Sequence, residues 1–281
     1  MRTIDVKEVT AAVSKLSKDA CYYLPDEMMA ALEASLTSEE SPLGREILET
    51  IIENAKLAKT TDCPICQDTG LAVVFAEIGQ DVHFEGGDLY EAIHAGIADG
   101  YINGYLRKSS VDDPLFDRKN TQDNTPAIIH VTVVKGDKVK LTLSPIGCGS
   151  ENMGALKMLK PSEGVDGVIK FVVDTVRNAG PNPCPPVTVG VGIGGNMELA
   201  TYLAKHSLTR PVGEHNTDPR YAELEKELLH RVNMTGIGPS GLGGSTTAVA
   251  VNVEYAPTHI GALPVAVNLN CHAARCAQVV L

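Results

Sequence analysis

The sequence predicts an α+β fold, in which a mixed, largely antiparallel sheet is flanked by helices and preceded by an N-terminal helical subdomain. Residues 6–59 carry helical periodicity with short breaks, and residues 128–143 carry the alternation of a β-hairpin. Apolar runs bounded by glycine then alternate with amphipathic stretches. We therefore expect a single domain over residues 1–281, made of a helical subdomain at 1–60 and an α+β part at 61–281.

The first helices can be located in the sequence by the residues at which they begin. We expect helices over residues 6–16, from Pro25 onward and from Ser41-Pro42 to Lys59, because proline at the first helical position beside an acid or a serine is a typical helix start. The apolar run 71–77 indicates a buried strand, and residues 88–106 have the apolar side of a helix. Residues 111–126 are polar and rich in turn formers, which predicts a long loop.

After residue 127, the elements are predicted from the alternation of apolar and polar residues and from the positions of glycine. The arms 128–134 and 139–143 flank a Gly136-Asp137 turn, so we expect them to pair with each other. The glycine loop 147–152 is expected to open a helix over the apolar run that follows. Further helices are expected at 165–178, 197–205 and 218–233, and strands at 187–193, at 246–254 and before Cys271. Neither later glycine run has the GxGxxG pattern in a βαβ context, which argues against dinucleotide binding.

Composition excludes some classes of partner. The formal net charge is −11, with 24 Lys and Arg against 35 Asp and Glu, so no nucleic-acid or anionic-membrane surface is expected. No apolar span approaches membrane length, and the first residues lack the apolar core of a signal peptide. We expect a cytoplasmic protein. Seven cysteines then indicate reduced thiols, which serve as metal ligands or as small buried apolar residues.

The run Cys63-Pro64-Ile65-Cys66-Gln67-Asp68-Thr69-Gly70 has the composition of a site. A zinc ribbon needs a second cysteine pair, and a thioredoxin-like motif needs the pair to open a helix after a strand; neither condition holds. A scattered ligand set remains, consisting of Cys66, Cys184 and Cys271, each in a Pro, Gly or Asn setting. Three thiolates can hold a 4Fe-4S cluster and leave one iron open to substrate.

Five motifs together resemble the α subunit of a two-subunit class I fumarate hydratase or of its sibling L(+)-tartrate dehydratase. They are Cys66 to Gly70, Gly147 to Ser150, Asn182 to Pro186 with its following glycines, Gly236 to Gly244, and Leu269 to Arg275. The resemblance covers essentially the whole chain. It implies an iron-sulfur hydro-lyase with a 4Fe-4S cluster held by Cys66, Cys184 and Cys271.

The resemblance also implies the other site residues. Cys63, Cys148 and Cys276 are then not ligands. The residues that match substrate contacts of the family are Gln67, Asp68, Arg107, Gly149 and His259. Among them Asp68 is expected to move a proton, because it follows a ligand cysteine; its alternative role is that of a turn or capping aspartate. Arg107 is expected to bind a substrate carboxylate, and its alternative role is that of a basic residue at a helix C-terminus.

The function expected from this resemblance is reversible hydration of fumarate to malate, a C4 dicarboxylate, with the open iron acting as a Lewis acid. The first alternative is the α subunit of L(+)-tartrate dehydratase, and the second is a non-catalytic metal-binding protein. The motif segments supply few cations for a dianionic substrate. We therefore expect a β subunit that completes the active site, within an α2β2 heterotetramer.

Overall fold

The computed structural model describes residues 1–281, and their contacts divide the chain into two compact units. The first unit contains Met1–Leu24, Ala55–Cys148 and Arg275–Leu281. The second contains Pro25–Asn54 and Gly149–Ala274. Each unit is assembled from separated segments, so distant parts of the sequence share one core. No helix is long and apolar enough to cross a membrane.

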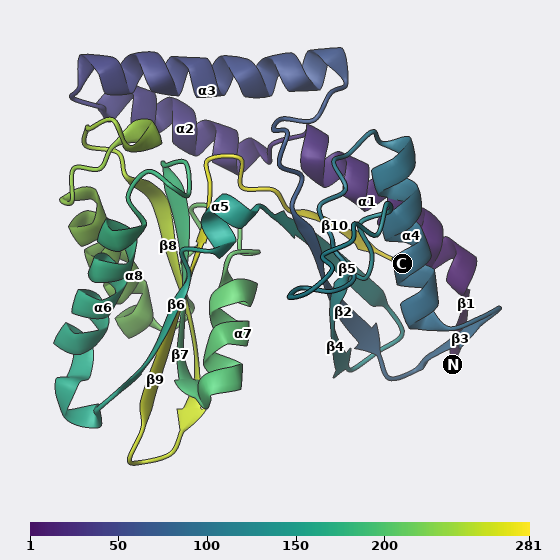
Figure 1. The fold of residues 1–281 in the computed structure, drawn as a ribbon. Helices are drawn as coiled ribbons and strands as arrows, with labels where there is room; N and C mark the ends of the chain where they lie inside the picture. The colour runs from purple at the N-terminus through teal and green to yellow at the C-terminus, as the bar shows by residue number, and fades with distance from the viewer. The chain divides into compact units, whose positions relative to one another are not determined.

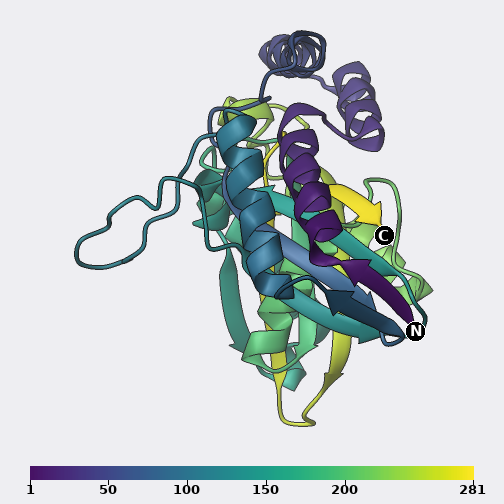
Figure 2. The ribbon, with the colours of Figure 1, turned by 90° about the vertical axis from the view of Figure 1, so that its right-hand side faces the viewer.

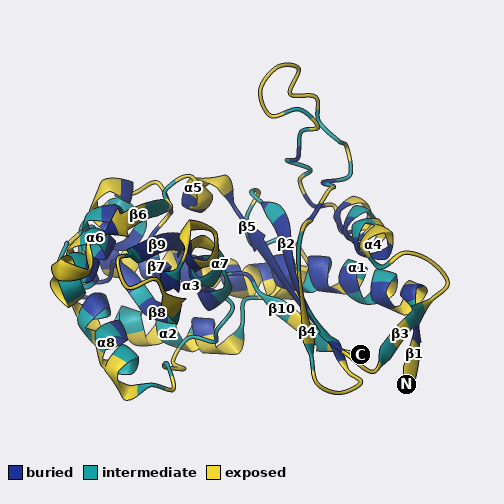
Figure 3. Cartoon of the chain, turned by 90° about the horizontal axis from the view of Figure 1, so that it is seen from below, coloured by how far each residue is buried: buried dark blue, intermediate teal, exposed yellow.

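The first unit is a four-stranded mixed sheet with two helices packed on one face (Figures 1 and 3). Its strands, in the order β10-β5-β2-β4, are Ala277–Val280, Val139–Ile146, Leu71–Gly79 and Ile128–Val134. The helices α1 (Val6–Tyr22) and α4 (Leu89–Asn103) lie side by side and bury their apolar faces against β2 and β5. A parallel pair, β1 (Arg2–Asp5) and β3 (Val82–Glu85), lies beside them.

The strands expected at 128–134 and 139–143 are present, but the prediction that they pair with each other is wrong. β2 lies between them, parallel to β4 and antiparallel to β5. Most of β2 is buried, and a strand shielded by neighbours on both edges keeps its backbone groups hydrogen-bonded. The turn between β4 and β5 instead spans the end of β2, where the amides of Gly79 and Asp81 donate to the carbonyls of Lys138 and Gly136.

The second unit has a four-stranded mixed sheet covered on both faces (Figure 1). Its strands, in the order β6-β9-β7-β8, are Ala155–Leu159, Leu263–Asn270, Val187–Gly195 and Ala248–Thr258. Helices α6 (Gly164–Ala179) and α8 (Pro219–Asn233) pack on one face, and α7 (Met197–Ser207) packs on the other. These sheets confirm the expected α+β class with mixed strand directions.

The second unit differs from the sequence-based expectation at residues 153–159, and it shows what the glycines of β7 do. The run 153–159, expected to be helical, contains the strand β6 (Ala155–Leu159), and the only helix at the glycine loop is the four-residue α5 (Cys148–Glu151). The glycines of β7 let α7 approach closely, because a Cβ added to Gly192 would lie 2.0 Å from the carbonyl oxygen of Ala200. This glycine run therefore serves helix packing.

The helices expected in residues 1–60 are present, and they are shared between the two units. α1 belongs to the first unit, whereas α2 (Asp26–Ser38) belongs to the second, and α3 (Pro42–Thr61) begins there. The strand β1 precedes them at residues 2–5.

A buried carboxylate joins the α2–α3 connection to the loop before β8. Glu39 is fully buried, and its oxygens accept hydrogen bonds from the amides of Ser41, Ser245 and Thr246 at 2.8–2.9 Å and from the Ser245 hydroxyl at 3.1 Å. Burial acts to raise the pKa of this carboxyl, but the hydrogen bonds outweigh it and hold the pKa at about 2. The carboxylate is therefore ionised and stabilising at neutral pH.

We expect Glu39→Gln to lower the free energy of unfolding at pH 7 by about 2 kcal/mol, because an amide cannot accept all of these bonds. The pKa of Glu39 lies near 2 when folded, against an ordinary value of 4.5. Its contribution is therefore complete above pH 4.5 and is lost as the pH falls toward 2. Urea unfolding at pH 7 and pH 3 measures the difference between variant and wild type, which should shrink at pH 3.

The exposed neighbour Glu40 is the matched control, and Glu40→Gln should leave the free energy of unfolding within about 0.5 kcal/mol of wild type. Equal effects of the two substitutions at pH 7 would contradict the role given to Glu39.

Candidate functional site

The predicted site residues lie in loops of both units. Cys66, Gln67, Asp68 and Arg107 belong to the first unit, and Gly149, Cys184, His259 and Cys271 belong to the second. Cys66 to Asp68 lie between α3 and β2, and Cys184 lies between α6 and β7. Cys271 directly follows β9. The sites are therefore described unit by unit.

In the first unit, three consecutive backbone carbonyls of the Cys66 loop are bound by three buried side chains. The Arg275 guanidinium donates to the carbonyl of Asp68, and the Tyr101 hydroxyl donates to that of Thr69 at 2.8 Å. The Asn124 amide donates to the carbonyl of Gly70 at 3.0 Å. Burial raises the pKa of the Tyr101 phenol well above its ordinary value, so it remains a donor at neutral pH. Three hydrogen bonds, each from a different part of the chain, therefore hold this loop in place.

The carboxylate of Asp68 joins its own loop to the glycine loop that follows β5. One oxygen accepts from the amide of Gly70 and the other from the amide of Cys148, both at 3.0 Å. The structure thus gives Asp68 the turn-forming contact that sequence reasoning held as its alternative role. The neighbouring Cys66 is partly exposed, and its sulfur lies 3.4 Å from the side-chain oxygen of the exposed Gln67.

Arg275 is a cation that sequence reasoning passed over. It is only 1% exposed, and it is the largest fully buried side chain of the protein. Its guanidinium also contacts the buried Cys21, whose thiol pKa burial raises to about 11 while Arg275 acts to lower it. The only sequence signal for Arg275 is its place in the run from Leu269 to Arg275.

Arg107 lies at the base of a long loop between α4 and β4, which Figure 2 shows extending away from the first unit. Its carbonyl accepts from the Thr69 hydroxyl at 2.8 Å, which ties it to the Cys66 loop, while its side chain is exposed. The carbonyl oxygen of the Asn124 side chain accepts from the amides of Ser109 and Ser110. Arg107 is thus a loop residue that follows α4, with its backbone bound to Thr69 and its side chain exposed; its substrate-binding role stays a prediction.

In the second unit, the cysteine among the prolines is held in a restricted conformation. Cys184 has φ of 52°, a left-handed conformation that is uncommon outside glycine, and its amide donates to the carbonyl of Pro181 at 3.0 Å. The glycine motif from Gly236 to Gly244 packs beneath this loop, because the amide of Ser240 donates to the carbonyl of Pro185 at 2.8 Å. The motif therefore supports the Cys184 loop.

Two predicted ligand loops meet in this unit. The amide and the ring nitrogen Nδ1 of His272 lie 3.3 and 3.0 Å from the carbonyl oxygen of Cys184, which places Cys271 next to the Cys184 loop. The cross-strand neighbours Thr188 and Asn270 each bury a side-chain oxygen that has no hydrogen-bond partner in the protein. Unpaired buried polar atoms beside the Cys184 and Cys271 loops fit a bound group with its own polar atoms.

His259 lies away from this pair. It is exposed in the turn between β8 and β9, where its Nδ1 accepts from the amide of Gly261 at 3.1 Å. Cys271 follows the other end of β9, and a strand of eight residues is about 26 Å long. Within the second unit, His259 and Cys271 are therefore not brought together.

All seven cysteines are free of disulfides, and neither unit alone gathers three His, Cys, Asp or Glu side chains that could hold a metal ion. The partly exposed or exposed thiols of Cys66, Cys184 and Cys271 have the accessibility that ligation requires, whereas Cys21 is buried as a neutral thiol. The first unit thus offers one accessible thiol, that of Cys66, and the second offers the neighbouring thiols of Cys184 and Cys271. Accessible thiols are suitable ligands for iron or zinc.

Comparison with known proteins gives one consistent result. A family model described as fumarate hydratase (fumerase) matches residues 10–280. A Methanocaldococcus jannaschii protein, provisionally named L(+)-tartrate dehydratase subunit alpha, is 40% identical over 272 residues, which are 95% of each chain. L(+)-tartrate dehydratase subunit alpha of Escherichia coli O157:H7 is 33% identical over 96% of this chain and 89% of its own length, and that of strain K12 is 32% identical.

The family model covers nearly the whole chain, and the relatives align over almost all of their own lengths. The chain therefore belongs to the fumarate hydratase family and is a hydro-lyase.

Proposed function

We propose that this chain is the α subunit of an iron-sulfur dehydratase that acts on L(+)-tartrate. The observation that carries the substrate is the name of its relatives: proteins 32–40% identical over at least 95% of this chain are named L(+)-tartrate dehydratase subunit alpha. Fumarate, the substrate favoured from sequence, becomes the second candidate, which the name of the family model supports.

The proposed cofactor is a 4Fe-4S cluster held by Cys66, Cys184 and Cys271. When bound, such a cluster with three thiolate ligands supplies an open iron that acts as a Lewis acid toward a substrate hydroxyl. Two observations support the ligand set: the meeting of the Cys184 and Cys271 loops, and the partly exposed sulfur of Cys66 in a loop fixed at three carbonyls.

The residues of the first unit supply binding and proton transfer in this proposal. Arg107 presents an exposed guanidinium, which can bind a substrate carboxylate through two parallel hydrogen bonds. Gln67, also exposed, presents an amide to substrate hydroxyl or carboxylate oxygens. Asp68 is the proposed proton carrier. Its carboxylate accepts hydrogen bonds from two backbone amides, and these bonds orient it.

The reaction removes a hydroxyl from one carbon of the dicarboxylate and a proton from its neighbour, and the two leave as water. From tartrate the product is an enol, which takes up a proton on carbon and becomes a 2-oxo dicarboxylate. With fumarate the same chemistry runs as addition, with hydroxyl on one carbon and a proton on the other. The chain's residues need to hold both carboxylates while a single proton moves.

We propose that a different, β subunit completes the site, since the relatives are named as alpha subunits. Charge supports this, because a dianionic substrate beside an anionic cluster needs more cations than the exposed Arg107 supplies. Gly149 contributes its backbone amide. The strand β9, about 26 Å long, separates His259 from Cys271, so a His259 that contacts substrate would come from a second copy of this chain. Two copies of each chain, an α2β2 assembly, accommodate both requirements.

The substrate is tested with the chain coexpressed with its β subunit and loaded with iron and sulfide without air. We expect kcat/KM for L(+)-tartrate to exceed the values for fumarate and malate at least tenfold. This chain alone, fully loaded, should show no turnover. Faster fumarate hydration would establish the second candidate, and turnover by the isolated chain would remove the need for a β subunit.

The ligand set is tested by cluster content, which does not depend on activity. We expect Cys184→Ser to lose most of the iron and sulfide bound after reconstitution, because a neutral hydroxyl is a poor replacement for thiolate. Cys63→Ser is the control and should keep wild-type content. Iron and sulfide are measured per chain, together with the visible absorbance of the cluster. Wild-type content in Cys184→Ser would exclude this residue as a ligand.

The role of Arg107 is tested by measuring KM and kcat separately. We expect Arg107→Ala to raise KM for the dicarboxylate about tenfold to a hundredfold and to change kcat less, because the lost interaction is made to the bound substrate throughout the reaction. Lys108→Ala, at the next residue of the same loop, should leave both constants near wild type. An equal rise in KM for both variants would indicate a general charge effect instead of a specific contact.

A further inference from the structure

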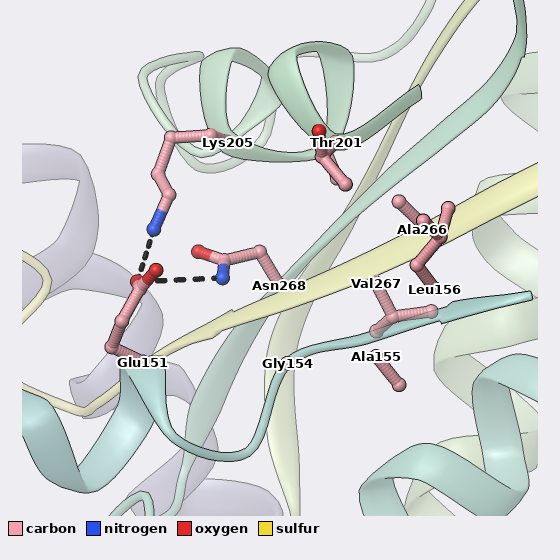
Figure 4. A pocket seen from close by; sticks show the side chains of 10 residues that line it. Glu151, Gly154, Ala155, Leu156, Thr201, Lys205, Ala266, Val267 and Asn268 are labelled. Carbon is pink, nitrogen blue, oxygen red and sulfur yellow. Dashed lines mark hydrogen bonds and ion pairs between the residues drawn. The ribbon is translucent and has the colours of Figure 1, made fainter. Parts of the chain in front are cut away.

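A partly buried ion pair joins the short helix α5, within the glycine loop, to α7. The Glu151 carboxylate at the end of α5 pairs with the Lys205 ammonium of α7, and the side-chain amide of Asn268 on β9 lies 3.5 Å from the same carboxylate. Figure 4 shows both side chains reaching Glu151 from separate elements at one edge of a cavity of about 260 Å³. All three residues belong to the second unit.

This pair differs from the surface ion pairs of the chain. The Lys205 side chain is 16% exposed and that of Glu151 is 42% exposed, and the other cavity walls are largely apolar, including Leu156 and Ala266. Burial lowers the pKa of Lys205, while the Glu151 carboxylate acts to raise it. A buried charge is costly without its partner, so removal of Glu151 leaves the Lys205 ammonium unpaired, and removal of Lys205 leaves Glu151 with only the long contact to Asn268.

The helix that this pair holds has little stability of its own. α5 spans four residues, and only the amides of Met153 and Gly154 continue its hydrogen bonding, to Ser150 and Glu151. A single turn is unfavourable in water, so its position depends on tertiary contacts. Gly149 in this turn packs closely on the Cys184 loop, because a Cβ added there would lie 2.9 Å from the carbonyl oxygen of Asn182.

We propose that Lys205, Glu151 and Asn268 are positioning residues that hold α5 so that the backbone of Gly149 faces the dicarboxylate substrate. This inference rests on the proposed function, which makes Gly149 a substrate contact. Lys205 and Asn268 do not touch the substrate; they act through Glu151. A backbone donor displaced by 1 Å loses most of a hydrogen bond, so this distant pair sets how well the substrate carboxylate is bound.

The test uses the assembled, cluster-loaded enzyme with Lys205→Met, Glu151→Gln and the double variant. Two quantities are measured: hydrogen exchange of the amides of residues 148–154, and KM with kcat for the preferred dicarboxylate. We expect each single variant to speed exchange in this segment at least tenfold and to raise KM about tenfold, with kcat within threefold of wild type. The double variant should be no worse than either single one, because the pair acts as a unit.

The control is the exposed pair Lys170 and Asp174 on α6, also in the second unit. Lys170→Met and Asp174→Asn should leave exchange of residues 148–154 and KM unchanged. The inference is overturned if exchange in 148–154 stays at the wild-type rate, if it rises equally over the whole second unit, or if it rises with no change in KM. A wild-type enzyme inactive on every dicarboxylate would defeat the proposed function, and the exchange data would still decide whether the pair holds α5.

Discussion

The site in the first unit depends on one constraint: the carbonyls of residues 68–70 are each bound by a buried side chain. Arg275 comes from the loop before β10, Tyr101 from α4 and Asn124 from the loop before β4. Buried polar groups are costly unless they are paired, so these three donors and three acceptors require one another. Any other conformation of the Cys66 loop would break one of these hydrogen bonds and leave a buried charge or dipole unpaired. Cys66 and Asp68 are therefore held in one position.

Most elements could be predicted because their signals are local. Proline starts, apolar periodicity and turn residues identified α1 to α4, α6 to α8 and the main strands. Strand pairing could not be predicted in the same way. The arms 128–134 and 139–143 look like a hairpin, but the hydrogen-bonding partner of each is β2, which lies some fifty residues or more earlier in the sequence. Alternation states which face of a strand is buried and contains no information on which strand lies beside it.

The site shows the same division between local and distant information. The prolines around Cys184 can be read from sequence and indicate a restricted backbone, whereas the left-handed conformation of Cys184 is known only from the structure. The role of Arg275 cannot be read in this way, because an arginine in a short motif gives no sign that it will be buried beside Asp68, 207 residues away. Likewise only eleven residues separate His259 from Cys271 in the sequence, yet the extended strand β9 among them holds the two residues far apart.

The first unit also has a consequence for biosynthesis. Its strand β10 and Arg275 are translated after the entire second unit, although β10 pairs with β5 and Arg275 binds the carbonyl of Asp68. While the ribosome makes residues 149–274, β5 of the nascent first unit has no partner strand on one edge, and the carbonyl of Asp68 has no guanidinium donor. Chain elongation takes seconds, so this half-built state outlives hairpin formation many times over. Assembly of the Cys66 loop is therefore a late event, because the carbonyl of Asp68 gains its guanidinium partner only after residue 274 has been translated.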